Sequence, residues 1–529
     1  MSRDILSTIS TRQTPQSKPA RVEQVPNSAG GFVFELDRRA QLRRFLTIGT
    51  GVGTHYVSAV DLTASNAKLI MAMARDDGLY LVEEIVRISE AGRAPKPNPA
   101  LFALAVASVA GDLATRQAAY AAIDKVCRTG THLFTFIGYR EQFGGWSRGL
   151  RTAVGSWYTN KSVNDLAYQV VKYRQRDGWS HRDLLRLSHP SPGYYSSHRP
   201  LFNWITKGAI DPALADVPLV AGFIQASEPG ADIPALIRQY HLSWEMLPSD
   251  ALSSAAVWDA LLDVGMPMTA LIRQLPRLTR LGLLPPIGGR TALVTAQITD
   301  QVKLRLARIH PISVLLAYKT YASGASLRGS STWTPTTPVI DALDSAFYQA
   351  FGNVEATGKR TLLALDISGS MGFPAAAGMP LTAREVSAAM ALITASVETE
   401  YLIMGFSHEL VPLAISPRQR LGDVIRAISD LPFGRTDCAL PMTTALADKR
   451  WGIESFVVYT DNETWAGSIH PHQALEKYRR KTGIPARSAV VGVTSTGFSI
   501  ADPKDAGQLD IAGFDAAVPS LLSDFFTGV

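Results

Sequence analysis

The sequence predicts two domains: an all-helical solenoid, followed by a doubly wound α/β domain. From Asn66 to about Ser323, helical patterns succeed one another with scarcely any strand signal. From Thr361 onward, apolar strand patterns alternate with helical patterns, which is typical of a parallel sheet with helices on both faces. The expected organisation is a mobile polar tail over residues 1–30, the helical domain over 31–358 and the α/β domain over 359–529.

The helical patterns of the first domain are amphipathic and are joined by short turns. Each helix must therefore bury its apolar face against a neighbour, and serial pairs of this kind argue for an α-solenoid of the HEAT or armadillo type. The expected helices include residues 66–77, 79–90, 99–113, 133–142, 163–176, 180–187, 200–207, 233–240, 254–262 and 292–308.

Basic charge is concentrated in the helical domain. Of the 52 Lys and Arg and the 46 Asp and Glu residues, 15 and 18 lie from Lys359 onward, a net charge of −3. The preceding 358 residues carry a net charge of +9, whereas the whole chain carries +6. This distribution indicates a polyanionic partner for the helical domain.

One stretch of the helical domain places basic residues at helical spacing. Lys172 and Arg176 are four residues apart and are expected on one face of a helix over 163–176, which Gly178 ends. Ser180 with Asp183 is a capping-box pattern that starts the next helix.

Two consecutive helices would thus present a basic surface of the kind that binds a phosphate backbone. A solvated outer face of a helical repeat would show the same pattern, and spacing does not separate the two interpretations. The candidate contacts are Lys172, Arg174, Arg176, Arg182, Arg186 and His189.

A possible metal site begins at Asp366-Ile367-Ser368-Gly369-Ser370, just after the apolar run 361–365. This run is expected to be a buried strand, and open α/β sheets bind ligands beyond the carboxyl ends of their strands. A carboxylate and two hydroxyls offer only oxygen donors, which suits Mg²⁺ and is compatible with Ca²⁺ or Mn²⁺. Alone, the motif is equally a turn that caps the helix near Arg384.

Two later segments add oxygen donors at loop ends. Residues 434–437 open a helical stretch, and residues 457–461 form another apolar strand that ends in a carboxylate. The ordered set resembles the metal-ion-dependent adhesion site of the von Willebrand factor A domain, which implies one open coordination position for a partner's acidic side chain. The candidate ligands are Asp366, Ser368, Ser370, Thr436 and Asp461.

The cysteines and the hydropathy bear on the cellular setting. Cys127 and Cys438 lie far apart, in different expected domains, which argues against a disulfide framework. No apolar run reaches the ~18 residues that span a bilayer. We therefore expect a cytoplasmic protein with no membrane partner.

From about Phe32 to its end, the chain resembles the TROVE-domain RNA-binding proteins, the family of the Ro 60 kDa autoantigen. The resemblance is carried by the phrases at residues 178–189, 307–311, 436–438 and 460–464. It implies a ring of HEAT-like repeats closed by the von Willebrand factor A domain. It also implies RNA quality control, rRNA maturation or a stress response as the setting.

The same resemblance implies the partners. Y RNA is expected on the outer basic surface, where the family's contacts fall on Lys172, Arg176 and His189, and single-stranded ends of misfolded RNAs are expected in the central hole. In bacterial relatives, the implied protein partner is an exoribonuclease, polynucleotide phosphorylase, tethered through the Y RNA.

Three functions were compared, and a non-catalytic RNA-binding scaffold is favoured. A metal-dependent phosphatase or nuclease is disfavoured, because Ser368 stands where an aspartyl phosphatase needs a second carboxylate and Glu463 is the only other acid nearby in sequence. His470 and His472 could serve as soft-metal ligands or a base, but their context is that of ordinary loop residues. A metal-dependent protein-docking module is compatible with RNA binding.

Overall fold

The protein is described here from a computed structural model that covers most of the chain. The described residues are 13–48, 59–91, 97–191, 196–307, 309, 311–326, 330–354, 356–372, 380–429, 431, 434–492, 498–512 and 518–527. The chain forms two compact units, which we call the sheet unit (Met1–Asn66, His310–Leu316 and Phe347–Val529) and the helical unit (Ala67–Ile309 and Ala317–Ala346).

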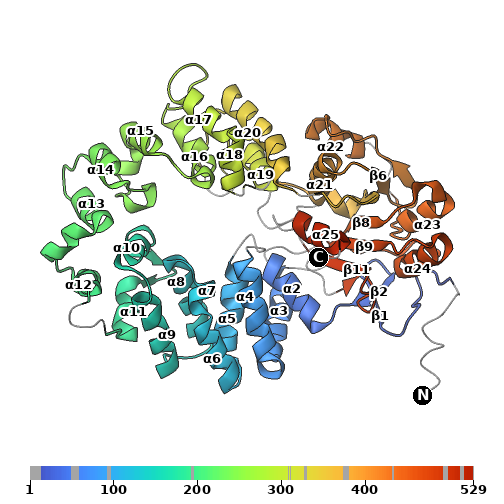
Figure 1. Cartoon of the computed structure of the whole chain (residues 1–529), viewed down its shortest axis with the longest axis horizontal. Coiled ribbons are helices and arrows are strands. Elements are labelled where there is room, and N and C mark those ends of the chain that lie inside the picture. Colours follow the sequence, from blue (N-terminus) through green and yellow to red (C-terminus); the bar gives the residue numbers. More distant parts are fainter. Residues whose placement is uncertain are drawn as a thin grey trace. The chain divides into compact units, whose positions relative to one another are not determined.

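The helical part of the chain is a succession of mostly short α-helices (Figure 1). They are α3 (Ala59–Asp76), α4 (Gly78–Glu90), α5 (Asn98–Ala110), α6 (Leu113–Ala121), α7 (Ile123–Val126), α8 (Gly130–Glu141), α9 (Arg148–Thr159), α10 (Val163–Lys172), α11 (His181–Ser188), α12 (His198–Lys207), α13 (Pro218–Ala226), α14 (Ile233–Tyr240), α15 (Ala255–Val264), α16 (Met268–Arg280), α17 (Thr291–Ile298), α18 (Gln301–Leu306), α19 (Pro311–Ala322) and α20 (Thr337–Gln349). Neighbouring helices pack in series, as in α4 on α5 and α14 on α15. The expected solenoid of paired helices is therefore confirmed.

An aspartate shortens one expected helix and divides another. The stretch 99–113 ends earlier, as α5 at Ala110, and Asp112 caps the next helix, α6, by accepting a hydrogen bond from the amide of Thr115 at 2.8 Å. The stretch 292–308 becomes α17 and α18, where Asp300 accepts from the amide of Lys303 at 3.0 Å. A short acidic side chain competes with the helix ladder for backbone amides, so it starts a new helix.

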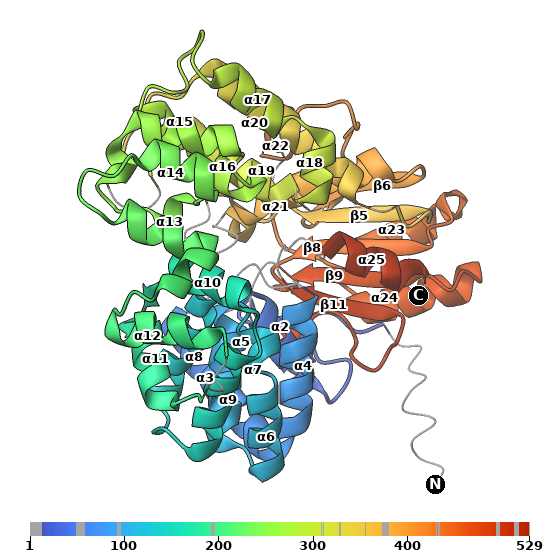
Figure 2. The same ribbon diagram turned by 60° about the vertical axis from the view of Figure 1, so that its left-hand side comes forward.

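The sheet unit is a doubly wound α/β domain (Figure 2). Its elements are β1 (Gln24–Pro26), β2 (Phe32–Glu35), α2 (Arg38–Ile48), β5 (Thr361–Asp366), α21 (Ala383–Val397), β6 (Tyr401–Phe406), β7 (Leu410–Pro412), α22 (Leu421–Ser429), α23 (Leu440–Ala447), β8 (Ser455–Thr460), α24 (Pro471–Thr482), β9 (Arg487–Gly492), β10 (Phe498–Ser499), β11 (Gln508–Ala512) and α25 (Val518–Thr527). The main sheet has the order β11-β9-β8-β5-β6-β7, and only β7 is antiparallel to its neighbour. From β5 the chain first adds β6 on one side and later β8 on the other, so the crevice of this fold lies at the carboxyl end of β5.

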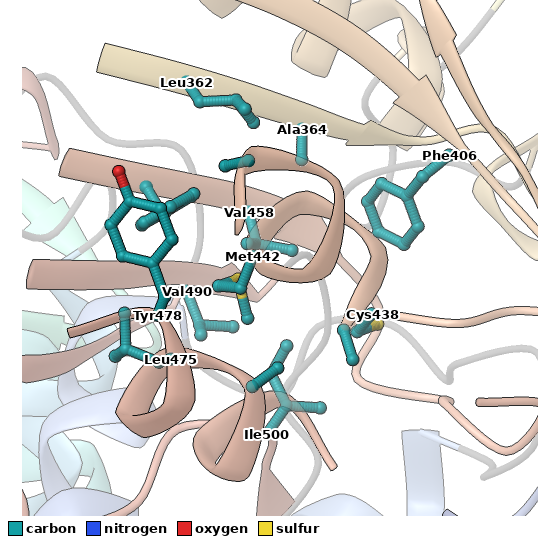
Figure 3. Packing of buried hydrophobic residues seen from close by; sticks show 14 of the residues in the cluster. Leu362, Ala364, Phe406, Cys438, Met442, Val458, Leu475, Tyr478, Val490 and Ile500 are labelled. Carbon is teal, nitrogen blue, oxygen red and sulfur yellow. The ribbon is translucent and has the colours of Figure 1, made fainter. Parts of the chain in front are cut away.

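The core of the sheet unit lies between the sheet and two helices (Figure 3). Strands β5 and β8 are buried at every position, as is usual for parallel strands that are covered on both faces. Successive residues of a strand point to opposite faces, so Leu362 and Ala364 of β5 lie on the same face and pack in one cluster with Met442 of α23 and Leu475 of α24.

The expected mobile tail is wrong for residues 13–30, which pack on the sheet unit. Together with β2 they form the amino-terminal segment, residues 13–35. β1 pairs with β2, and β2 pairs with β10, all antiparallel. The backbone amide of Gln16 also donates to the Gly467 carbonyl at 2.9 Å. β10 and Gly467, the partners of β2 and Gln16, lie more than four hundred positions away in the sequence, so no local pattern could reveal them.

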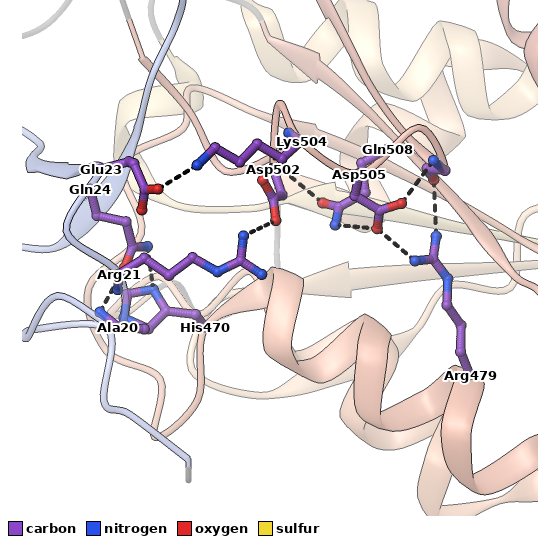
Figure 4. Close-up of polar contacts among 11 residues, drawn as sticks. Ala20, Arg21, Glu23, Gln24, His470, Arg479, Asp502, Lys504, Asp505 and Gln508 are labelled. Atoms are coloured by element: carbon purple, nitrogen blue, oxygen red, sulfur yellow. Dashed lines mark hydrogen bonds and ion pairs between the residues drawn. The ribbon is translucent and has the colours of Figure 1, made fainter. Parts of the chain in front are cut away.

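Ion pairs and hydrogen bonds hold the same segment (Figure 4). Arg21 pairs with Asp502 at 2.5 Å, and Lys504 pairs with Glu23 at 2.5 Å. Asp502 is only 5% exposed, so its charge is compensated inside the structure. The segment is therefore an integral part of the domain that was expected to begin at residue 359.

Two further features concern the cysteines and the membrane. Cys127 and Cys438 are both buried free thiols. Within the described ranges, the helices lack an apolar stretch long enough to cross a membrane.

Candidate nucleic-acid interface and metal centre

The basic stretch of the helical unit is not two consecutive helices. Helix α10 ends at Lys172, and Arg176 belongs instead to a short hairpin of β3 (Gln175–Arg176) and β4 (Trp179–Ser180). The expectation that Lys172 and Arg176 share one helical face is therefore wrong. The hairpin arises because Asp177 and Gly178 both adopt positive φ, 52° and 81°, the turn type that Asp-Gly favours.

The hairpin is fixed to the rest of the unit at its turn. The Thr135 hydroxyl of α8 donates to the Asp177 carboxylate at 2.8 Å. After the hairpin, Ser180 and Asp183 form the predicted capping box of α11. The hairpin thus has hydrogen-bonded anchors at its turn and at the start of the following helix.

Five of the six candidate contacts are exposed: Arg174 and Arg176 on this connection, and Arg182, Arg186 and His189 on α11 and its carboxyl-terminal cap. Arg174 lies 4.9 Å from the ring centroid of Phe223, and Arg186 donates to the Thr206 carbonyl at 3.2 Å. Arg176 lies 3.5 Å from the carboxylate of its neighbour Asp177, in a pair that is about half exposed. Such pairs are worth little, so the Arg176 guanidinium can exchange this partner for a phosphate.

Lys172 differs from the other candidates, because its side chain is only 15% exposed. Its ammonium donates to the Tyr168 hydroxyl at 2.7 Å and lies 3.8 Å from the Glu245 carboxylate. Burial lowers the pKa of the ammonium, but the bond to Tyr168 and the charge of Glu245 outweigh it, so the pKa lies above its usual value. The sequence pattern could not reveal Glu245, which is remote in the chain, whereas Tyr168 lies one helical turn before Lys172 and its spacing was a usable signal.

The metal candidates lie at the carboxyl ends of adjacent strands in the sheet unit. Asp366 ends β5 and is buried; it accepts hydrogen bonds from the Ser368 amide at 2.9 Å and from the Thr460 hydroxyl of β8 at 2.8 Å. The hydroxyls of Ser368 and Ser370 are 3.1 Å apart.

The other two candidate ligands lie on loops that meet this edge. Thr436 lies on the loop that follows α22, and its carbonyl accepts a hydrogen bond from the Trp465 amide at 3.1 Å. The backbone amide of the next residue, Asp437, donates to the carbonyl of Ser407, which follows β6, at 2.8 Å. Asp461 directly follows β8 and is buried. Asp366 is therefore the last residue of β5, and the other four candidates lie on segments that follow β5, α22 and β8.

The charges at this edge suit a cation. Burial, together with the nearby charge of Asp461, raises the pKa of Asp366 to about 7. Two buried carboxylates that repel each other are stabilised by a cation between their loops, and the remaining donors are hydroxyls. The residues therefore fit a hard divalent ion that is bound through oxygen.

Several residues that the sequence analysis did not assign to the site hold its loops. The side-chain amide nitrogen of Gln16 donates to the Asp437 carboxylate at 2.7 Å, and the side-chain oxygen of Gln16 accepts from the Thr464 hydroxyl. The Asn27 amide group donates to the Thr464 carbonyl at 2.8 Å. The amino-terminal segment thus supports the loops that carry Thr436 and Asp461.

The remaining acid and the two histidines also contact the amino-terminal segment. Glu463 is buried and accepts from the Ala29 amide at 3.0 Å; burial, with the charge of Asp461, raises its pKa to about 7. His470 contacts the Gln24 side chain at 3.1 Å, and His472 packs against Phe34 with ring centroids 4.9 Å apart. Each of the three side chains therefore has a packing role within the sheet unit.

This combination defines a class: a helical repeat protein with a basic surface, joined to an α/β domain of the von Willebrand factor A type. A model of the TROVE domain matches residues 25–210 and 238–320, and a model of the Ro60 vWA domain matches residues 360–526.

Similar proteins specify the family. The chain is 39% identical to the RNA-binding protein RO60 of Deinococcus radiodurans, with 99% of each chain covered. It is 36% identical to the RNA-binding protein RO60 of Caenorhabditis elegans, over 97% of this chain and 91% of the relative. The crystal structure of the D. radiodurans Ro (RSR) protein superposes with a TM-score of 0.74 at 37% identity, covering 93% of this chain and 100% of that one. The chain belongs to the Ro60 family of RNA-binding proteins.

Proposed function

We propose that this protein binds small non-coding RNA of the Y RNA type at the connection between α10 and α11, as a non-catalytic scaffold. The observation that carries the proposal is the anchored hairpin, on and around which five basic or histidine side chains of residues 174–189 are exposed. The net charge of +9 over the first 358 residues supports it, because basic side chains that contact RNA phosphates release counterions and thereby raise the affinity.

The proposal extends to the further partners of a cytoplasmic RNA scaffold. Single-stranded ends of misfolded RNAs are proposed as additional ligands, and an exoribonuclease such as polynucleotide phosphorylase as the protein tethered through the Y RNA. RNA quality control, rRNA maturation and the stress response are the processes that such an assembly would serve.

Replacing Arg176 with alanine is expected to weaken binding of a Y-type RNA and to flatten its salt dependence. Each lost phosphate contact removes about one unit from the slope of log affinity against log salt concentration. Filter binding or fluorescence anisotropy at several salt concentrations, with the intact chain, measures both quantities.

The matched control for this measurement is Arg450→Ala. Arg450 is also an exposed arginine that pairs with a nearby aspartate, Asp448, but it lies in the sheet unit. We expect its slope to equal that of the unmodified protein. An unchanged slope for Arg176→Ala would show that this guanidinium makes no phosphate contact.

For the sheet unit, we propose a bound divalent cation, Mg²⁺ in the first instance, held by Asp366, Ser368, Ser370, Thr436 and Asp461. Support comes from the all-oxygen donor set and from the repulsion between the two buried carboxylates. An open coordination position would accept an acidic side chain of a protein partner, which is compatible with RNA binding elsewhere.

Replacing Asp366 with alanine is expected to abolish cation binding while RNA affinity stays unchanged, because the proposed RNA contacts belong to the helical unit. Titration with Mn²⁺, followed by electron paramagnetic resonance, measures the first effect, and anisotropy measures the second. Ser370→Ala is the milder variant, since among the described residues this half-buried hydroxyl has the Ser368 hydroxyl as its hydrogen-bond partner. Equal Mn²⁺ affinity in both variants and the parent would refute the site.

A further inference from the structure

Tyr168 is an exposed aromatic residue within the proposed RNA interface. Among the large apolar side chains that remain exposed in the described ranges, it is the only aromatic one, with 38% of its surface accessible. The apolar face of α10 is already formed by other buried residues: Leu166, Ala167, Val170 and Val171. Core packing therefore does not account for Tyr168.

The ring of Tyr168 is held in a defined position. Its hydroxyl accepts from the Lys172 ammonium, one helical turn later, and this nitrogen lies 5.0 Å from the ring centroid. Tyr173 approaches the same ring edge to face, with centroids 6.3 Å apart and planes 78° apart. An exposed ring that is already ordered loses little conformational entropy when a ligand stacks on it.

We propose that Tyr168 is an RNA-contacting residue whose ring stacks on an unpaired base, while the Lys172 ammonium that it positions contacts the adjoining phosphate. Base stacking on an aromatic ring needs an exposed face, and a cation beside that face favours a nucleotide over an uncharged apolar ligand. The phosphate competes with Glu245 for the ammonium, because the two groups are 3.8 Å apart, beyond hydrogen-bond distance, and the Glu245 side chain is 26% exposed. The inference rests on the proposed function and adds the RNA feature that is recognised.

The test compares two RNA hairpins that differ only by one unpaired adenosine within the stem. Tyr168→Leu, which keeps an apolar side chain but removes the ring, should lower the affinity for the bulged hairpin about tenfold. Its effect on the fully paired hairpin should stay under about twofold, because a paired base offers no free face. Tyr168→Phe, which keeps the ring, should retain most of the discrimination between the two RNAs.

Two further variants make the result decisive. Tyr240→Leu is the control: Tyr240 is likewise a tyrosine of the helical unit, but it is half-buried, and its hydroxyl accepts from the Gln225 side chain at 3.0 Å and not from a cation. Arg176→Ala should lower the affinity for both hairpins. If Tyr168→Leu affects both hairpins equally or neither, while Arg176→Ala weakens both, the stacking role is overturned and the proposed function stands. If Arg176→Ala also has no effect, the proposed interface itself is refuted.

Discussion

Gly31→Ala is expected to destabilise the sheet unit by about 3 kcal/mol, at the upper end of the range for overpacking. A β-carbon at this position would lie 1.8 Å from the Thr464 carbonyl oxygen and 2.9 Å from the Trp465 α-carbon. Both are backbone atoms, so no side-chain rotation relieves the clash. The amino-terminal segment must move away, and the bond from the Asn27 side chain to the Thr464 carbonyl is lost with it.

Urea unfolding of the intact chain, followed by tryptophan fluorescence, measures this loss, and limited proteolysis within residues 13–35 reports release of the segment. Gly422→Ala is the control: its β-carbon meets nothing within 4 Å, and alanine favours the helix α22. We expect that variant to be as stable as the parent or slightly more so. A parent-like transition for Gly31→Ala would contradict the close approach of the two backbones.

His472→Phe is expected to reduce the loss of folding stability that the sheet unit shows at acid pH. Neither ring nitrogen of His472 has a hydrogen-bond partner among the described residues, and the ring is 3% exposed. Burial, with the charges of Arg21 and His470, lowers its pKa from 6.5 to about 3, and only Asp505 acts in the opposite direction. An apolar ring of similar shape therefore leaves no additional polar group unpaired.

The sign of the pH effect follows from the lowered pKa of His472. Above pH 6.5 the histidine is neutral in both states, and the full stability is present. Below pH 6.5 the His472 ring is protonated in the unfolded chain but stays neutral in the folded chain. The free energy of unfolding therefore falls as pH falls, by about 1.4 kcal/mol per pH unit. At pH 5 this histidine accounts for a loss of about 2 kcal/mol, which His472→Phe should abolish.

Urea unfolding at pH 7 and pH 5 checks this expectation. The informative comparison is His470→Phe, because the ring nitrogens of His470 contact the Gln24 side chain at 3.1 Å and the Lys18 carbonyl at 2.8 Å. That variant should be less stable at both pH values, since the buried Gln24 side chain and the Lys18 carbonyl lose their hydrogen bonds to the ring. If His472→Phe were equally destabilising at pH 7, then the ring nitrogens of His472 must have partners in solution.

The sequence by itself determined the fold class and the placing of two candidate metal ligands, Asp366 and Asp461, after neighbouring strands. Helical and strand periodicity are local properties, so the alternation after Thr361 predicted the parallel sheet without knowledge of any contact. Parallel strands bring their carboxyl ends to one edge, and this rule placed Asp366 and Asp461 together. The capping box at Ser180 was predictable for the same reason, because all of its atoms lie within four residues.

Only the tertiary structure decided which long-range contacts fix these elements and which basic side chains are exposed or paired. Residues 13–30 looked like a polar tail because their partners, such as Asp437 and Thr464, are more than four hundred residues away. Lys172 was expected with Arg176 on one solvated helical face, whereas in the structure its ammonium lies 3.8 Å from the Glu245 carboxylate. Local patterns record how a segment satisfies its own backbone, whereas the burial and pairing of a side chain depend on segments that folding brings to it.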